Sequence, residues 1–147
     1  MKKLYRILPM LLVGVLSIAL WSCSDDDEPV PVTKLPSSAQ TFLNTYFDNV
    51  DIISVTKDKD DYDVLLSNGY SVEFNTSGEW TDVDAPVGKT VPTGFYPAAI
   101  DTYISSAYSG NGINEISRID RGYEVELING TDLYFSADGT YIGIDRD

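Results

Sequence analysis

Histidine is absent from the 147-residue chain, and cysteine occurs once, at Cys23. Without histidine the chain has no Ser-His-Asp or Cys-His catalytic system and no histidine-based zinc site. A single cysteine forms neither an internal disulfide nor a cysteine-based zinc site. A pair of carboxylates is the hydrolytic machinery that these absences still permit.

Basic residues are few: ten Lys and Arg stand against 23 Asp and Glu, which gives a formal net charge of −13. Removal of residues 1–22 would take away three basic groups and no acids, leaving 7 − 23 = −16. A surface with this charge repels phosphate backbones and anionic headgroups. We therefore expect no nucleic-acid partner, and membrane contact only through a lipid anchor.

The apolar run Ile7–Leu20 is about 14 residues long, whereas a bilayer-spanning helix needs about 20. It follows three basic residues, so the beginning of the chain is typical of a secretory signal. The run ends in LWSC, with Leu20 three residues before Cys23 and a small residue directly before it. This pattern resembles the lipobox of bacterial lipoproteins, which implies lipidation of Cys23 and a signal peptide at 1–22. A free cysteine beside an ordinary cleavage site is the alternative.

Residues 23–34 read as an acidic, proline-containing tether. Ser24 and then four acids follow the cysteine, an arrangement that resembles the surface-export signal of lipoproteins in some Gram-negative bacteria. Pro29 and Pro31 favour an extended spacer. The expected location is the outer membrane of a Gram-negative bacterium, surface-exposed or periplasm-facing, although the acids also suit a plain solvated tether.

An offset of 61 residues relates two copies of one unit without a gap. It carries FNTSGEW, from Phe74, onto FSADGTY, from Phe135, and Asn68-Gly69 onto Asn129-Gly130. The matches fall at core-type and at turn positions, so we expect a tandem repeat. The expected segments are repeat 1 at 35–84, a linker at 85–94 and repeat 2 at 95–147.

Each copy opens with apolar residues at helical spacing and continues with short alternating segments separated by turn residues. The helical stripe of the first copy consists of Ala39, Phe42, Leu43, Tyr46, Phe47 and Val50. Strands of this copy are expected near 52–57, 62–67, 70–75 and 79–84. The order in each repeat is therefore α-β-β-β-β.

Turn lengths predict which strand residues face the core. Val64 and Leu66, like Val72 and Phe74, stay inward together if Ser67–Gly69 form a three-residue loop closed by a glycine bulge. Ser77-Gly78 and Asp138-Gly139 suit two-residue loops.

The two-residue loops predict cross-strand partners in the second copy. Phe135 would pair with Ile142 and Leu133 with Ile144, all inward. Tyr134 would then pair with Gly143, and Ser136 with Tyr141, all outward. Trp80 corresponds to Tyr141 in the repeat and would also point outward.

The stretches LPSSAQTFLNTYFDNVDIISV and YDVLLSNGYSVEFNTSGEW resemble the PepSY-like domains, also called β-lactamase-inhibitor-like domains. The resemblance covers both copies, about residues 35–145. It implies an α+β fold in which two tandem α-β-β-β-β repeats form an antiparallel sheet with the helices packed on one face. The β-lactamase inhibitor protein binds its target enzyme through the open face of its sheet, which is a precedent for binding by this fold.

Two candidate sites follow from these patterns. The outward face would carry Trp80, Tyr134 and Tyr141, with Leu65 and Ile128 nearby and the acids Asp63, Glu73, Glu124 and Glu126 flanking them. Contiguous exposed aromatics indicate an interface. The alternative is that the packing of the two copies or the tether covers this face. The segment KDKDDYD offers Asp58, Asp60, Asp61 and Asp63 as a calcium candidate, although it lacks the glycine and the distal glutamate of an EF-hand loop. A solvated hairpin turn is the alternative reading of that segment.

The expected function is a non-enzymatic binding module, without a cofactor, that recognises a protein or peptide through the open face of the sheet. A hydrolase with a carboxylate pair is the alternative from another class. A structural envelope lipoprotein without a small-molecule ligand is the third.

Overall fold

The computed structural model describes residues 28–144. The expected signal peptide and Cys23 lie outside the described residues. Within residues 28–144, no helix has both the length and the apolar character needed to cross a membrane.

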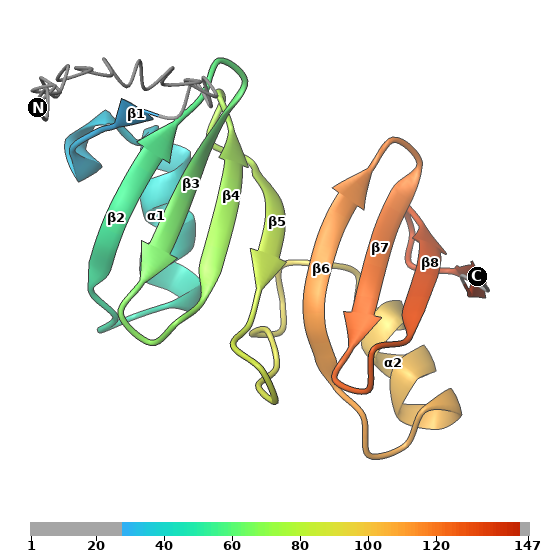
Figure 1. Cartoon of the computed structure of the whole chain (residues 1–147). Helices are drawn as coiled ribbons and strands as arrows, with labels where there is room; N and C mark the ends of the chain where they lie inside the picture. The colour runs from blue at the N-terminus through green and yellow to red at the C-terminus, as the bar shows by residue number, and fades with distance from the viewer. Residues whose placement is uncertain (1–27, 145–147) are drawn as a thin grey trace, which may run out of the picture.

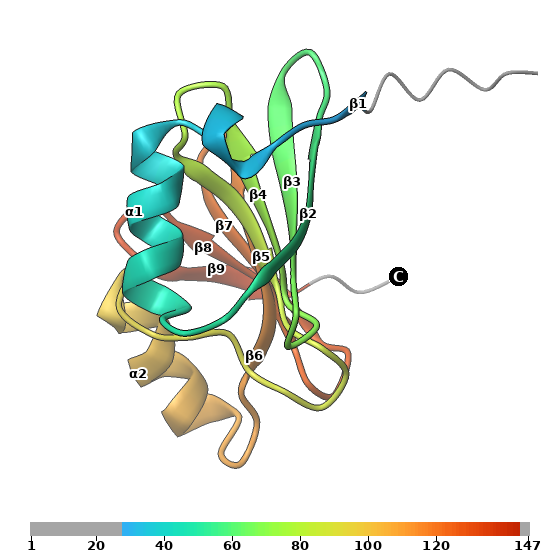
Figure 2. The same ribbon diagram turned by 90° about the vertical axis from the view of Figure 1, so that its left-hand side faces the viewer.

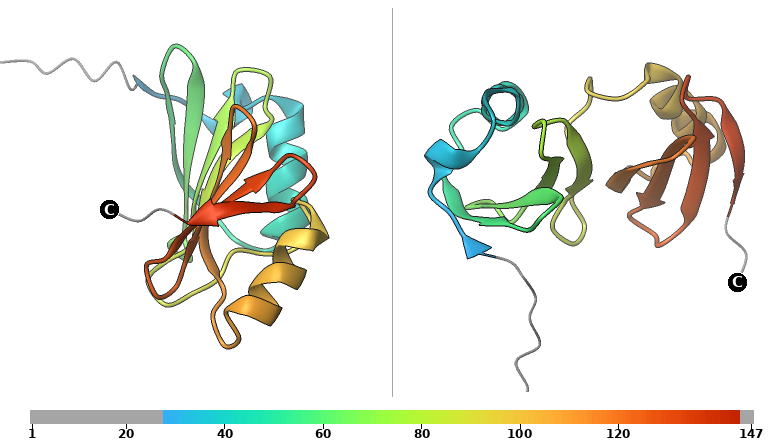
Figure 3. Two further views of the ribbon diagram at one scale, coloured as in Figure 1. Left: turned by 90° about the vertical axis from the view of Figure 1, so that its right-hand side faces the viewer. Right: turned by 90° about the horizontal axis from the view of Figure 1, so that it is seen from above.

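In the described part of the chain, nine strands form one antiparallel sheet in which the spatial order equals the sequence order (Figure 1). The strands are β1 (Glu28–Pro29), β2 (Ile52–Lys57), β3 (Asp61–Leu66), β4 (Ser71–Asn75), β5 (Trp80–Asp84), β6 (Ile113–Ile119), β7 (Gly122–Leu127), β8 (Asp132–Ser136) and β9 (Tyr141–Ile144). A short 3-10 helix, η1 (Val32–Lys34), precedes α1 (Ser37–Tyr46), and α2 (Ala98–Ala107) precedes β6. Both α-helices lie on one face of the sheet and leave the other face open (Figures 2 and 3). The expected α+β fold is confirmed.

The core lies between the helices and the sheet. Each helix buries one short stripe against it: Ala39 and Leu43 from α1, Ile100 and Ile104 from α2. The strands supply the opposite wall through alternate residues, because successive side chains of a strand point to opposite faces. Those with no more than 1% exposure are Val64, Leu66, Val72, Phe74, Val83, Ile116, Val125, Leu127, Leu133 and Phe135.

The β3–β4 turn and its counterpart, the β7–β8 turn, have the expected length. The amide of Leu66 donates to the carbonyl of Tyr70 at 2.9 Å, and Gly69 closes the loop with φ +88°. The corresponding bond joins Leu127 to Thr131 at 2.9 Å. Three residues therefore form each loop.

The β4–β5 turn of the first copy and the β8–β9 turn of the second, which we call the second turn, are also three-residue loops, so the predicted two-residue loops are wrong. Asn75 donates its amide to the carbonyl of Glu79 at 2.9 Å, and Ser136 does the same to Thr140. The side-chain oxygen of Asn75 also accepts from the amides of Ser77 and Glu79, at 3.0 Å each. These side-chain bonds favour the longer loop over the dipeptide turn that the glycine alone suggested.

The extra turn residue changes the register beside the turn only. Phe74 pairs with Trp80 and Phe135 with Tyr141, so the predicted pairs of Phe135 with Ile142 and Ser136 with Tyr141 are wrong. The ladder shifts by one residue immediately afterwards. Leu133 then pairs with Ile144 and Tyr134 with Gly143, as predicted.

Candidate functional site

The open face of the sheet carries carboxylates in two adjacent rows that run across the strands. Each carboxylate flanks a core residue, so alternation turns it away from the helices. The first row is Asp63, Glu73, Asp82, Ser117, Glu124 and Tyr134. The second row is Leu65, Ser71, Asp84, Glu115, Glu126 and Asp132. We call these twelve positions the acidic face; eight of them are Asp or Glu.

Several of these acids lie directly opposite one another. Glu73 pairs with Asp82 across β4 and β5, and Glu115 pairs with Glu126 across β6 and β7. Like charges at directly opposed positions destabilise a sheet. Within residues 28–144, no lysine or arginine occupies a position in the two rows.

Partial burial, and after it the crowding of acids, raises the pKa of the carboxyls at the centre of the face. Partial burial, and then the charges of Asp82, Asp63 and Asp61, raise the pKa of Glu73 to about 7. Partial burial, followed by Asp82 and Asp84, likewise raises the pKa of Glu115 to about 7.

The aspartates of β5 are shifted in the same direction. Burial raises the pKa of Asp82 above its ordinary value, although a hydrogen bond from the hydroxyl of Ser117 opposes the shift. Burial also raises the pKa of Asp84. The face therefore gains negative charge as the pH rises through neutrality.

A shallow hollow of about 220 Å³ lies on the β6–β8 part of the acidic face. Its lining is polar throughout and consists of Glu115, Ser117, Glu124, Glu126 and Asp132. The hydroxyl of Tyr134 donates to Oε1 of Glu124 at 3.0 Å at its edge. An oxygen-lined hollow of this kind suits a cationic group.

Two of the predicted interface aromatics lie on the helix side of the sheet instead: Trp80 is buried in the core, and Tyr141 is partly buried against it. Trp80 is 4% exposed and packs against Phe95, with ring centroids 4.9 Å apart. Tyr141 stacks on Tyr103 of α2 at 4.3 Å and 12°. The cause is the longer second turn, which moves both residues to the helix side.

The other predicted interface residues keep an outward position. Tyr134 belongs to the first row of the acidic face, and Leu65, 41% exposed, belongs to the second. Ile128, 43% exposed, directly follows β7. Ile142, displaced outward beside the second turn, is 63% exposed. The exposed apolar residues are therefore scattered around the acids and do not form the aromatic patch expected.

The calcium candidate does not assemble into a metal site. The side chain of Asp58 accepts the amide of Lys59, and its carbonyl accepts Nζ of Lys57 at 2.8 Å. Asp61 and Asp63 belong to β3. Among residues 28–144, no three His, Cys, Asp or Glu side chains are grouped so that they could hold a metal ion.

Half of the carboxylates of the acidic face were not predicted as part of a site: Asp82, Asp84, Glu115 and Asp132. A signal was present in the sequence, because DVD at 82–84 and EVE at 124–126 alternate acid and apolar residues with the period of a strand. The alignment of these segments across five strand boundaries becomes visible only in the sheet register.

Comparison with known proteins identifies the family. The sequence model of a family described as "Putative beta-lactamase-inhibitor-like, PepSY-like" matches residues 19–69 and 60–143. Curated proteins contain no match to this chain.

Three solved structures are similar over most of this chain. A "putative calcium-regulated periplasmic protein" from Bacteroides thetaiotaomicron is 35% identical, with a TM-score of 0.77, and the alignment covers 83% of this chain and 98% of that one. A "putative periplasmic protein" from Bacteroides vulgatus is also 35% identical, with a TM-score of 0.76 and coverage of 84% and 99%. A second Bacteroides vulgatus protein, described as periplasmic and of unknown function, is 32% identical, with a TM-score of 0.77 and coverage of 82% and 99%.

The matched part accounts for almost the whole of each solved relative. These relatives therefore form the matched fold without a counterpart of the 16–18% of the present chain that the alignments leave out. Together with the two matches of the family model, the likeness shows that the chain belongs to the β-lactamase-inhibitor-like, PepSY-like family.

Proposed function

We propose that this protein is an exported, lipid-anchored, non-enzymatic binding module that recognises a positively charged protein or peptide through the acidic face. The observation that carries the proposal is the alignment of eight carboxylates in two rows whose other four positions are Leu65, Ser71, Ser117 and Tyr134. Opposed like charges reduce the stability of the free protein. A cationic partner relieves this repulsion, so the face is complementary to such a partner.

The cell envelope is the location that fits this function. Three relatives are described as periplasmic. The anchor rests on Leu20 and Cys23 after a basic and apolar segment. Glu28, the first residue of β1, is five positions after Cys23, and an extended chain of five residue steps spans at most about 18 Å. A lipidated Cys23 would therefore hold the β1 edge of the sheet close to the membrane.

A hydrolase with a carboxylate pair is the weaker alternative. The acid of such a pair needs a raised pKa, and Glu73 and Glu115 meet this condition. However, both belong to an open sheet face, and the hollow beside Glu115 measures only about 220 Å³. Nothing in that arrangement encloses a substrate, whereas a broad charged face suits a macromolecular partner.

Calcium is a second candidate ligand of the acidic face, because one relative is described as calcium-regulated. Carboxylate oxygens are the ligands that calcium prefers. Glu115, Glu124 and Glu126 line the hollow but are not grouped as a metal site in residues 28–144, so binding would require these side chains to move together. A calcium titration of the thermal unfolding midpoint tests this: the Glu115→Gln variant should lose a calcium-dependent rise that the parent shows, and a parent without any rise excludes calcium.

Affinity capture from an envelope extract tests the proposed function. Residues 24–147 would be immobilised as the parent, as a Glu115→Gln/Glu126→Gln variant and as an Asp48→Asn/Asp51→Asn control that removes the same charge outside the acidic face. A partner relevant to the face is captured by the parent and the control but lost with the face variant. Capture that does not differ among the three proteins contradicts the proposal.

A further inference from the structure

The tip of the β6–β7 hairpin differs in charge from its counterpart in the first repeat. The offset of 61 aligns KDKDDY, from Lys57, with RIDRGY, from Arg118. The first segment has three acids, whereas the second has one acid and two arginines. Arg118 and Arg121 are the only arginines among residues 28–144, so the structure gathers both at one hairpin tip.

The guanidinium of Arg118 is held on an aromatic surface. Its central carbon lies 4.3 Å from the centre of the Trp80 ring, and the ring of Tyr123 stacks with Trp80 at 6.1 Å and 17°. Trp80 is fixed in the core, while Arg118 is exposed. A cation over an indole face is stabilised by the ring quadrupole and keeps the N–H groups at its edge for other partners.

The first repeat has a cation, Lys57, at the same position, but this ammonium group finds its hydrogen-bond partner within its own turn. Nζ of Lys57 lies 5.4 Å from the centre of the Tyr62 ring and donates to the carbonyl of Asp58 at 2.8 Å. Arg118 has no ion pair with any residue of the segment 28–144. The second repeat therefore holds a guanidinium in a fixed position without an ion-pair partner among residues 28–144. In the first repeat the equivalent ammonium group is bonded to the neighbouring carbonyl.

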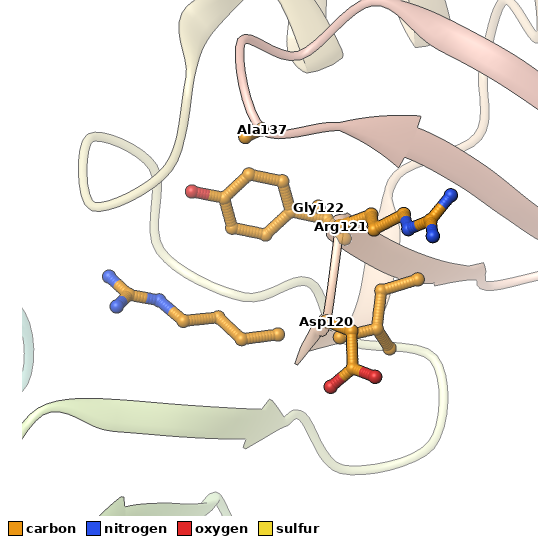
Figure 4. A pocket seen from close by; sticks show the side chains of 7 residues that line it. Asp120, Arg121, Gly122 and Ala137 are labelled. Atoms are coloured by element: carbon orange, nitrogen blue, oxygen red, sulfur yellow. The ribbon is translucent and has the colours of Figure 1, made fainter.

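A pocket of about 250 Å³ at this hairpin tip has Arg118 among its lining residues (Figure 4). Ile119, Tyr123 and Ala137 give it apolar walls, and Arg121 and Asp120 complete its rim with side chains that extend in different directions. Gly122 also lines the pocket, and no larger residue fits there, because a Cβ at this position would lie 1.9 Å from the carbonyl oxygen of Phe135. The close approach of β7 to β8 at this point thus requires glycine.

We propose that this Arg118 pocket binds a ligand that carries one carboxylate next to a small apolar group. The planar fork of a guanidinium matches a carboxylate with two parallel hydrogen bonds. The apolar walls would take the adjoining aliphatic group. Asp120 at the rim and the net charge of −13 disfavour a doubly charged anion such as phosphate. The pocket lies on the helix side of the sheet, so it is independent of the acidic face.

Fluorescence of Trp80 provides the test, because Trp80 is the only tryptophan in residues 24–147. This segment would be titrated at pH 7 and constant ionic strength with N-acetyl-L-leucine, with its neutral amide and with inorganic phosphate. We expect a saturable change with the acid, and binding about tenfold weaker or absent with the amide. Equal responses to acid and amide, tighter binding of phosphate, or no saturable change with the acid overturns the proposal.

Two variants locate the binding site. Arg118→Gln should abolish the response to the acid, whereas Lys57→Gln, which removes the equivalent cation of the first repeat, should leave it intact. Thermal melts of both variants report whether the fold is retained. If Arg118→Gln does not fold, Arg118→Lys replaces it, and a loss of affinity of about tenfold is expected because lysine lacks the planar fork. An unchanged affinity in the folded Arg118 variant contradicts the assignment.

Discussion

Phe74 lies directly opposite Trp80 across the β4–β5 hairpin, and both side chains point into the core. The ring of Phe42 from α1 contacts both of them, at centroid distances of 5.6 Å and 6.4 Å. The pair therefore fastens the first helix to the sheet next to the boundary between the two repeats.

Removal of either ring should destabilise the fold. Trp80→Ala and Phe74→Ala should each lower the free energy of unfolding by about 3–5 kcal/mol, because both leave a cavity in the core. Ile142→Ala is the control, since Ile142 is 63% exposed, and its effect should stay within about 0.5 kcal/mol. Denaturant unfolding measures all three. A Trp80→Ala variant as stable as the Ile142→Ala control would place the indole outside the core.

Substitution of Gly78 in the β4–β5 turn should be destabilising, because the beginning of α1 lies against this glycine. A Cβ on Gly78 would lie 2.6 Å from Cβ of Pro36, whereas a Cβ on Gly130 has nothing within 4 Å. The two glycines share a positive φ, +79° and +75°. Gly78→Ala should therefore cost about 2 kcal/mol more than Gly130→Ala, the difference being the steric overlap. Equal losses of unfolding free energy in the two variants would show that the helix does not approach this turn.

Stability should fall as the pH rises towards neutrality. Glu73 and Glu115 have pKa values of about 7 in the folded protein, above the ordinary 4.5. The folded state then holds more protons than the unfolded state between about pH 4.5 and 7. The free energy of unfolding must therefore decrease as the pH rises through this window. Thermal melts of the parent should show a lower midpoint at pH 8 than at pH 5.

The double variant Glu73→Gln/Glu115→Gln isolates this effect. It should flatten the decline between pH 5 and 7 and be more stable than the parent at pH 8. The Asp48→Asn/Asp51→Asn control should keep the slope of the parent. If the face variant retains the full slope, the decline arises from other groups.

Membrane attachment should depend on Cys23. Cys23→Ser should shift the protein from the membrane fraction to the soluble fraction, because it removes the thiol that would carry the lipid. Ser22→Ala is the control and should leave the protein membrane-bound. Mass spectrometry of the amino-terminal peptide of the parent should detect acyl chains. A Cys23→Ser protein that is as membrane-bound as the parent would contradict the anchor.

Much of the fold follows from the period of the sequence. The 61-residue offset and the strict alternation around Val64, Val72 and Val125 predict both the elements and the side of the sheet that each residue occupies. The error arose at Ser77-Gly78, where a dipeptide suited to a short turn forms part of a longer one. One extra loop residue reverses the facing of the next side chain, and this moved Trp80 from the expected interface into the core.

The acidic face was predictable only in part, for a different reason. Alternation within single strands turns each carboxylate outward, but it does not say which carboxylates are neighbours. Glu115 and Glu126 become adjacent through the register of β6 and β7, which includes a shift between Ile113 and Glu115. The Arg118 pocket is even harder to predict from the sequence, because it depends on the contact between the guanidinium of Arg118 and the ring of Trp80 on another strand.

Titration of the acidic face with a defined cationic peptide tests the central claim most directly. Isothermal calorimetry at low salt would compare a Lys- and Arg-rich peptide binding to residues 24–147 as the parent, as Glu115→Gln/Glu126→Gln and as Asp48→Asn/Asp51→Asn. At about pH 8.5, above the pKa of Glu115, the two variants have equal net charge and differ only in where charge is removed. We predict that the face variant binds about tenfold more weakly than the parent, while the control stays within about twofold. Equal affinities for the two variants would mean that the peptide responds to net charge alone, and the acidic face would not be the binding site.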